Sequence, residues 1–176
     1  MADVTAIKTI REKTHAPLGA IRKALEQAHG NEAQALQILR EQGASVALKR
    51  AGAAAGEGRI EAYIHHDGKV GAIVEVNCET DFVARTPEFR QFCRDLAMQV
   101  TAKHPQHLAK DEITPEQIAS SGMTEQAFLQ ETCLLEQPFI KDGSQTIGQY
   151  VTAMTATTGE RIIVKRFLRL QVGGAS

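Results

Sequence analysis

An acidic and an aromatic residue stand side by side at a polar turn, where Asp81 precedes Phe82. The apolar run 70–76 comes before this turn, and Pro87 begins a helical pattern after it. A carboxylate beside a large apolar side chain suits entry into another protein's pocket, where it would repel a charge or displace a side chain. The same pattern is equally typical of a core Phe82 with Asp81 as a helix cap. Both interpretations stay open on pattern alone.

The other candidates for chemistry favour a structural role. His65 and His66 are metal-ligand types, but neighbouring strand residues point to opposite faces and cannot share one ion without distortion. Cys78 has no adjacent histidine or lysine to lower the pKa of its thiol, so an enzyme that uses it is the weakest alternative. Cys93 and Cys133 fall in helical patterns, as small hydrophobic residues do. We expect no metal site and no catalytic residue.

The composition is that of an ordinary globular protein, with 43% hydrophobic and 23% charged residues in 176. The 20 basic and 21 acidic residues give a formal charge of −1, which argues against binding driven by nucleic-acid phosphates. The sequence contains neither Gly-x-x-x-x-Gly-Lys-Ser/Thr nor Gly-x-Gly-x-x-Gly, the two glycine-rich motifs that bind nucleotide phosphates. We therefore expect no nucleotide or other cofactor. Three cysteines without short spacing favour a reducing compartment, and no signal or membrane segment is evident. We expect a cytoplasmic protein.

Residues 3–42 show the apolar spacing of three short helices. Pro17 suits the start of the second helix, and Asn31 suits the cap of the third. Gly43 is expected to end the third helix, and the Ala-rich residues 44–55 to form a fourth that leads away. The predicted division is a helical domain over 1–54, a linker over 55–58 and a second domain over 59–176.

Residues 59–77 predict a β-hairpin with its turn at Asp67-Gly68. A two-residue loop would pair Ile64 with Gly71 and place the apolar residues of the two strands on opposite faces. A three-residue loop would pair Ile64 with Val70 and place both sets on one face, with Gly68 at positive φ. We therefore expect the three-residue loop.

Helical patterns follow Thr86-Pro87 and recur over 114–120, 124–136 and 147–158, and 137–145 is expected to be a loop. Residues 161–172 alternate as a strand. The first of these helices is expected to bury Phe89, Phe92, Leu96 and Val100. A hairpin joined by a third strand predicts an antiparallel three-stranded sheet with helices on one face, which is an α+β fold.

Three separated blocks resemble the elongation factor Ts family. The first lies within residues 10–25, the second is Glu-Val-Asn-Cys-Glu-Thr-Asp-Phe-Val-Ala-Arg at 75–85, and the third covers 134–142 with 159–167. Their order and spacing agree over nearly the whole chain. The resemblance implies an N-terminal three-helix domain of the ubiquitin-associated type, followed by the α+β module.

The resemblance also implies a function, which is guanine nucleotide exchange on the GTPase elongation factor Tu. Phe82 would wedge between two GTPase helices, and Asp81 would disturb the Mg²⁺ and phosphate site. Such a factor needs no covalent chemistry of its own, because it and GDP weaken each other's binding by the same factor. The residues implied to contact the GTPase are Thr80, Asp81, Phe82, Val83, Ala84 and Arg85, with Arg11, Thr14, Pro17 and Leu18 as a less secure N-terminal contact.

Some positions depart from the family pattern. His15 replaces a usual glycine, Gly19-Ala20-Ile21 replaces a more polar stretch, and residues 114–122 form a shortened segment. Long members carry two copies of the α+β module and this chain has one, so we hypothesise a homodimer. The alternative function is a non-catalytic adaptor whose helical domain binds a ubiquitin-like partner.

Overall fold

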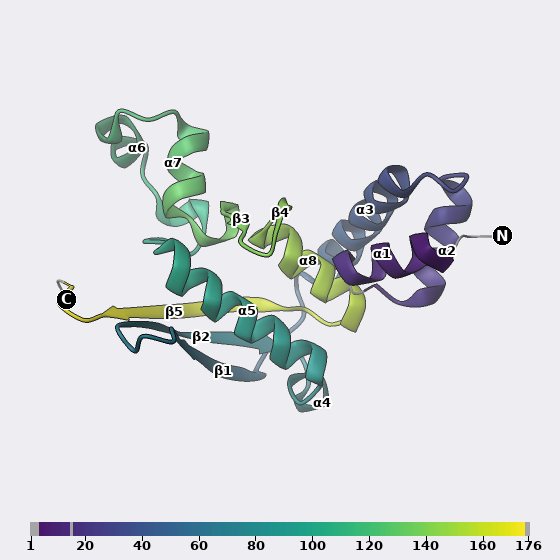
Figure 1. The fold of residues 1–176 in the computed structure, drawn as a ribbon, viewed down its shortest axis with the longest axis horizontal. Coiled ribbons are helices and arrows are strands. Elements are labelled where there is room, and N and C mark those ends of the chain that lie inside the picture. Colours follow the sequence, from purple (N-terminus) through teal and green to yellow (C-terminus); the bar gives the residue numbers. More distant parts are fainter. Residues whose placement is uncertain (1–3, 15, 175–176) are drawn as a thin grey trace.

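Three helices at the N-terminus fold into a small bundle. A computed structural model describes residues 4–14 and 16–174, and its helices are α1 (Val4–Thr14), α2 (Leu18–Gln27) and α3 (Glu32–Arg50) (Figure 1). Asn31 caps α3 as predicted, since its side-chain oxygen accepts a hydrogen bond from the Gln34 amide at 3.1 Å. The bundle core consists of Ala6, Ile10, Ile21, Ala24, Leu25, Ala28 and Ala35.

The third helix is longer than the sequence pattern predicts. The prediction that Gly43 ends it, and that a separate helix covers 44–55, is wrong because α3 continues to Arg50. Gly43 is buried against α8 (Ile147–Thr158), where an added Cβ would lie 3.5 Å from the Ala156 Cβ. This packing outweighs the low helix propensity of glycine. Strand β1 begins at Glu57, inside the expected linker 55–58, and the domain limits stay a prediction.

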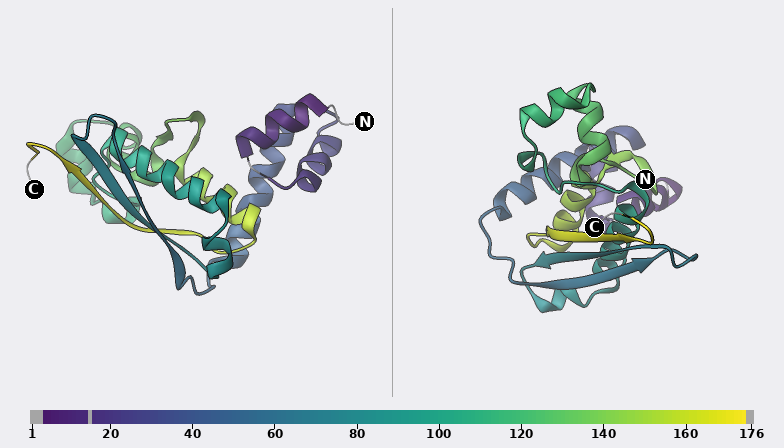
Figure 2. Two further views of the ribbon diagram at one scale, coloured as in Figure 1. Left: turned by 60° about the horizontal axis from the view of Figure 1, so that its bottom comes forward. Right: turned by 90° about the vertical axis from the view of Figure 1, so that its left-hand side faces the viewer.

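The sheet has three antiparallel strands in the order β1–β2–β5, as predicted. They are β1 (Glu57–Ile64), β2 (Val70–Cys78) and β5 (Ile163–Gln171). Helix α5 (Pro87–Lys103) runs along one face of the sheet, and Figure 2 shows the opposite face bare. The chain is therefore an α+β protein with its helices on one side of the sheet.

The hairpin register is the one that sequence analysis rejected. Ile64 lies opposite Gly71, not Val70, so the predicted three-residue loop is wrong. The His65 amide donates to the Val70 carbonyl at 2.8 Å, so the four residues 66–69 form the turn between these two. Gly68 lies in this turn, and its φ of 67° agrees with the prediction. This register places the apolar sets of β1 and β2 on opposite faces.

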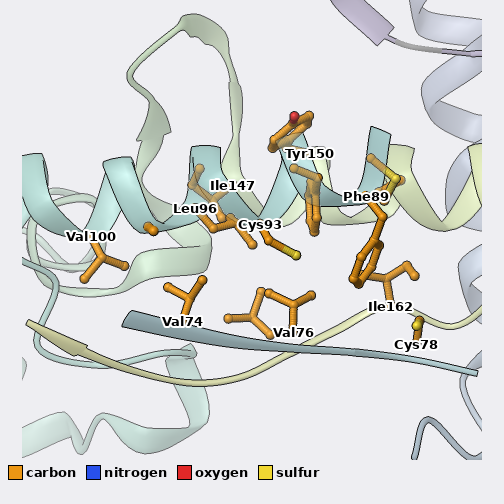
Figure 3. Packing of buried hydrophobic residues seen from close by; sticks show 14 of the residues in the cluster. Val74, Val76, Cys78, Phe89, Cys93, Leu96, Val100, Ile147, Tyr150 and Ile162 are labelled. Atoms are coloured by element: carbon orange, nitrogen blue, oxygen red, sulfur yellow. The ribbon is translucent and has the colours of Figure 1, made fainter. Parts of the chain in front are cut away.

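The core lies between the sheet and helices α5 and α8 (Figure 3). Thr86 caps α5 and Pro87 occupies its first turn, as predicted. The buried face of α5 is confirmed, because Phe89, Phe92, Leu96 and Val100 are all fully buried. Figure 3 shows Phe89, Leu96 and Val100 on the side of α5 that faces Val74 and Val76 of β2, with Tyr150 of α8 on the side away from the sheet.

The segment between α5 and α8 forms an outlying layer of short elements (Figure 1). Helices near the expected ranges are confirmed, but the predicted loop 137–145 contains a two-stranded ribbon. The elements are η1 (Lys110–Glu112), α6 (Pro115–Ser121), α7 (Glu125–Thr132), η2 (Leu134–Glu136), β3 (Pro138–Phe139) and β4 (Asp142–Thr146).

The open face of the sheet carries apolar side chains in cross-strand rows. Ala62, Ile73 and Leu168 form one row by register, and Ile64 and Leu170 flank Gly71 in the next. A bulge interrupts the β2–β5 pairing, because Glu75 pairs with Arg166 while Val76 pairs with Val164. The bulge reverses the alternation of β5, so Val164 faces the core while Leu168 and Leu170 face solvent. We call the exposed residues Ile60, Ile64, Ile73, Leu168 and Leu170 the open-face cluster.

Candidate binding site at residues 80–85

A one-turn helix, α4 (Asp81–Ala84), follows the end of β2. Its cap is Thr80, whose hydroxyl oxygen accepts a hydrogen bond from the Val83 amide at 3.4 Å. Arg85 ends the turn, and its amide donates to the Asp81 carbonyl at 3.2 Å. A helix of one turn is unstable alone, so neighbouring groups must hold it in place.

The two sides of α4 have opposite environments. Val83 and Ala84 are buried, each 7% exposed, and belong to the main core. Phe82 is 78% exposed and projects from the other side. The interpretation of Phe82 as a core residue is therefore wrong. An aromatic side chain this exposed leaves most of its apolar surface in water and available to a partner.

Asp81 is not the helix cap, and it is not a bare acid. Thr80 occupies the cap position, and Asp81 forms an ion pair with Arg85, with Oδ2 and Nη2 2.8 Å apart. Both side chains are largely exposed to solvent. Exposed pairs contribute little stability, about 0–1 kcal/mol, so a partner's charges could separate this one at small cost.

A carboxylate from a distant part of the sequence supports the start of α4. Glu160 Oε2 accepts hydrogen bonds from the amides of Glu79 and Thr80, both at 3.1 Å. Glu160 Oε1 accepts from the Thr80 hydroxyl at 2.6 Å. In return, Glu79 Oε1 accepts from the Arg161 amide at 2.6 Å. We call this reciprocal pair of carboxylates the Glu79/Glu160 clamp.

Two arginines join the clamp to the chain that leaves the bundle. The Arg50 guanidinium, at the end of α3, lies 3.4 Å from Glu79 Oε2. The Arg161 guanidinium donates to the Ala53 carbonyl at 2.7 Å. Sequence reasoning missed these groups as site residues, although Glu160 and Arg161 lie in the third family block. Glu160 and Arg161 are about 80 residues from α4 in the sequence, and no local pattern signals such a contact.

Cys78 lies at the base of the site and is buried. Its Sγ donates to the Thr80 carbonyl at 3.1 Å. Burial, with a smaller effect from the Glu160 charge, raises the pKa of the Cys78 thiol to about 11. The thiol therefore stays protonated near neutral pH, which disfavours the alternative of a nucleophilic cysteine.

The N-terminal candidates lie on the helical bundle, apart from α4. Arg11 and Leu18 are exposed, and Thr14 donates to the Ile10 carbonyl at 2.7 Å. Thr14 and Pro17 line a cleft of about 500 Å³ between the bundle and α8. His15, a departure from the family pattern, lies outside the described residues. The structure thus presents two separate candidate surfaces.

Two kinds of feature are absent from the described part of the chain. No group of three or more potential metal-ligating side chains occurs among residues 4–14 and 16–174. Over the same residues, no helix combines the length and apolar character that a bilayer span requires.

Comparison with known proteins extends these observations. A family model described as Elongation factor TS matches residues 4–127 and 115–174. The chain belongs to the elongation factor Ts family. An elongation factor Ts from Moorella thermoacetica is 41% identical, covering 95% of this chain and 93% of its own length. One from Desulfitobacterium hafniense is also 41% identical, covering 98% and 91%, and one from Koribacter versatilis is 41% identical, covering 95% and 86%.

Membership of the elongation factor Ts family assigns the chain to translation elongation and nucleotide exchange. The resemblance stated from three sequence blocks is thereby confirmed over nearly the whole chain. The roles of individual residues do not follow from family membership, and they have to be argued from the geometry of the site.

Proposed function

We propose that this protein binds elongation factor Tu in its GDP form and accelerates GDP release. The observation that carries the proposal is the exposed Phe82, held on a one-turn helix whose other side is buried. Fixing an aromatic side chain before binding reduces the entropy lost on association. Phe82 enters an apolar gap between two helices of the GTPase and forces them apart.

Asp81 acts beside Phe82 as the charged element of the site. Its exposed ion pair with Arg85 opens when the GTPase approaches, which leaves a carboxylate near the Mg²⁺ and phosphate site. Thr80 and Arg85 form the polar rim, while Val83 and Ala84 anchor the turn to the core. Mg²⁺ links the nucleotide phosphates to the GTPase, so disturbing it weakens GDP binding.

The mechanism is thermodynamic linkage and involves no covalent step by this chain. If the factor lowers the GTPase's affinity for GDP, then GDP lowers its affinity for the factor equally. GTP in excess then binds and displaces the factor. Arg11, Thr14, Pro17 and Leu18 supply a second contact on the same GTPase, which increases affinity without taking part in the wedge.

The test is release of labelled GDP from purified elongation factor Tu with the double variant Asp81→Ala, Phe82→Ala. Burying a phenylalanine contributes about 1.5–3 kcal/mol, so the second-order rate constant should fall roughly 10–100-fold. Met123→Ala is the control, because Met123 is also an exposed large apolar residue and lies before α7, far from α4 in Figure 1.

The control should exchange as fast as the parent, and both variants should keep the parent's circular dichroism spectrum. A double variant that releases GDP at the parent rate would show that residues 81 and 82 are not the wedge.

We also propose that the chain forms a homodimer through the open-face cluster. The cluster is apolar and lies on the sheet face opposite α5. Ala62 and Gly71 leave a hollow of about 370 Å³ between the larger side chains of the cluster. A second copy related by a two-fold axis would place its own Ile and Leu side chains against this hollow, as facing sheets do in a sandwich. Light scattering at micromolar concentration should give twice the chain mass of 19.1 kDa, and a monomer mass would refute the dimer.

A further inference from the structure

We infer that Glu160 is a positioning residue for nucleotide exchange, which holds the Thr80 end of α4 so that Phe82 faces the partner. The inference rests on the proposed function of Phe82. Glu160 lies in the connection between α8 and β5 and is half-buried, and its carboxylate contacts the start of the exposed turn.

Both oxygens of the Glu160 carboxylate are used. One accepts two consecutive backbone amides, those of Glu79 and Thr80, and the other accepts the Thr80 hydroxyl. Two successive amides directed at one oxygen fix the backbone at this point, because the direction of each N–H depends on the peptide plane that carries it. The carboxylate therefore sets the path by which the chain leaves β2.

Thr80 transmits this constraint into α4. A threonine hydroxyl has one hydrogen to donate and lone pairs to accept. The Thr80 hydroxyl donates its hydrogen to Glu160 and accepts from the Val83 amide. The acid thus determines how the cap is oriented, and the cap determines the direction of the single turn that presents Phe82.

The reciprocal half of the clamp prevents the acid from moving away. Glu79 accepts from the Arg161 amide, directly after Glu160, and also pairs with Arg50. The two carboxylates therefore tie the end of β2 and the start of β5 to each other in both directions. The apolar core beneath includes Val83 and is made of hydrophobic side chains, so neither acid belongs to it.

The main test compares GDP release by Glu160→Gln with that of the parent. The substitution replaces one acceptor oxygen with an NH2 group, which is a hydrogen-bond donor. This donor then faces other donors, which are either the two backbone amides or the Thr80 hydroxyl. Hydrogen bonds to a charged group contribute about 1.5–3 kcal/mol, so we expect roughly tenfold slower GDP release. Glu61→Gln is the matched control, because Glu61 is also half-buried but pairs with Arg59, at 2.6 Å. It should leave the rate unchanged.

Hydrogen exchange provides a readout of the turn itself. The Glu79 and Thr80 amides should exchange about tenfold faster in Glu160→Gln, since the same carboxylate protects both. Amides of α5 should keep the parent rates. A general loss of protection across α5 would mean that Glu160 serves overall stability, and it would overturn the inference.

A double-mutant cycle separates positioning from other roles. If Glu160 acts only through Phe82, adding Glu160→Gln to Phe82→Ala should slow release no further. If the fold-losses in GDP-release rate of the two single variants multiply in the double variant, the inference is overturned. An unchanged release rate for Glu160→Gln alone would overturn it too. If Phe82→Ala itself has no effect, the proposed function fails instead, so the two failures are distinguishable.

Thr80→Val provides an independent route in case Glu160→Gln folds poorly. Valine removes the hydroxyl and leaves the carboxylate with both backbone amides. We expect a smaller loss of exchange rate than for Glu160→Gln, and restoration by Thr80→Ser. A Thr80→Val rate equal to the parent's would show that the cap is not the route of action.

Discussion

At the scale of single residues, burial controls the chemistry of the three cysteines. Cys78, Cys93 and Cys133 are all free and buried. Burial raises the pKa of the Cys93 thiol to about 12 and raises that of Cys133 as well. Sequence neighbours indicated only that no activating group stands next to Cys78. The structure adds the positive reason, which is that a buried thiol is more stable protonated than as a charged thiolate.

We predict slow alkylation of the folded chain by iodoacetamide at pH 8. The Cys78 pKa moves from an ordinary 9.0 to about 11, so the thiolate fraction is small and the sulfur is also inaccessible. The pKa of the Cys78 thiol is higher in the folded chain than in the unfolded chain. The stability that comes from burying the neutral thiol is therefore fully present below pH 9, and it is lost as the pH rises towards 11. Mass spectrometry should find three modified cysteines in denaturant and almost none without it. Rapid modification of folded Cys78 would contradict this.

At the scale of elements, helix starts and the antiparallel sheet were predictable, but the register of the hairpin was not. Asn31, Thr86 and Thr146 each accept a hydrogen bond from the amide three residues later, which is a local interaction that a short sequence window contains. The hairpin register depends on which face α5 covers and on a four-residue turn. Alternation within β1 alone indicates a one-sided strand, but it does not indicate which side is covered.

The same reasoning explains the wrong end of α3. A glycine inside a helix costs about 1 kcal/mol of stability relative to alanine. At Gly43 the helix continues nonetheless, because α8 packs closely against it there. The partner helix lies more than 100 residues later, so the sequence near Gly43 contains no sign of it.

Replacing Gly43 with alanine should stabilise the protein. The new Cβ would lie 3.5 Å from the Ala156 Cβ and 3.6 Å from the Thr152 Cγ2, which are ordinary contact distances. We expect about 0.5–1 kcal/mol of added stability and a Tm higher by about 2–4 °C. Gly19→Ala is the control, because Gly19 lies within α2 and its Cβ would meet no atom within 4 Å. A lower Tm for Gly43→Ala alone would mean that α3 and α8 pack more tightly than described.

At the scale of the whole molecule, the two candidate surfaces are connected through α3. This helix leaves the bundle, packs on α8 through Gly43 and ends at Arg50, which pairs with Glu79 beneath α4. Residues 80–85 could be singled out as a candidate site because they are consecutive, although the pattern left open whether Phe82 is buried or exposed. Its support was not, because Glu79 and Glu160 meet only when the fold is complete.

The open-face cluster gives a prediction at this scale. Leu168→Glu would place two carboxylates in the apolar centre of the proposed dimer, so light scattering should then report a monomer. Leu48→Glu is the matched control, since Leu48 is an equally apolar, exposed residue on α3. Loss of the dimer in both variants, or in neither, would exclude the open face as the interface.

The Glu79/Glu160 clamp has a consequence for synthesis of the chain. Residues 79–85 are synthesised before the carboxylate that holds them, which follows about 80 residues later in the sequence. Closing so long a loop is slow and requires α8 and the first residues of β5 to dock. Under the proposed function, a chain that has not yet closed this loop would carry the sequence of the wedge without its shape. Such a chain would compete poorly with folded molecules for the GTPase.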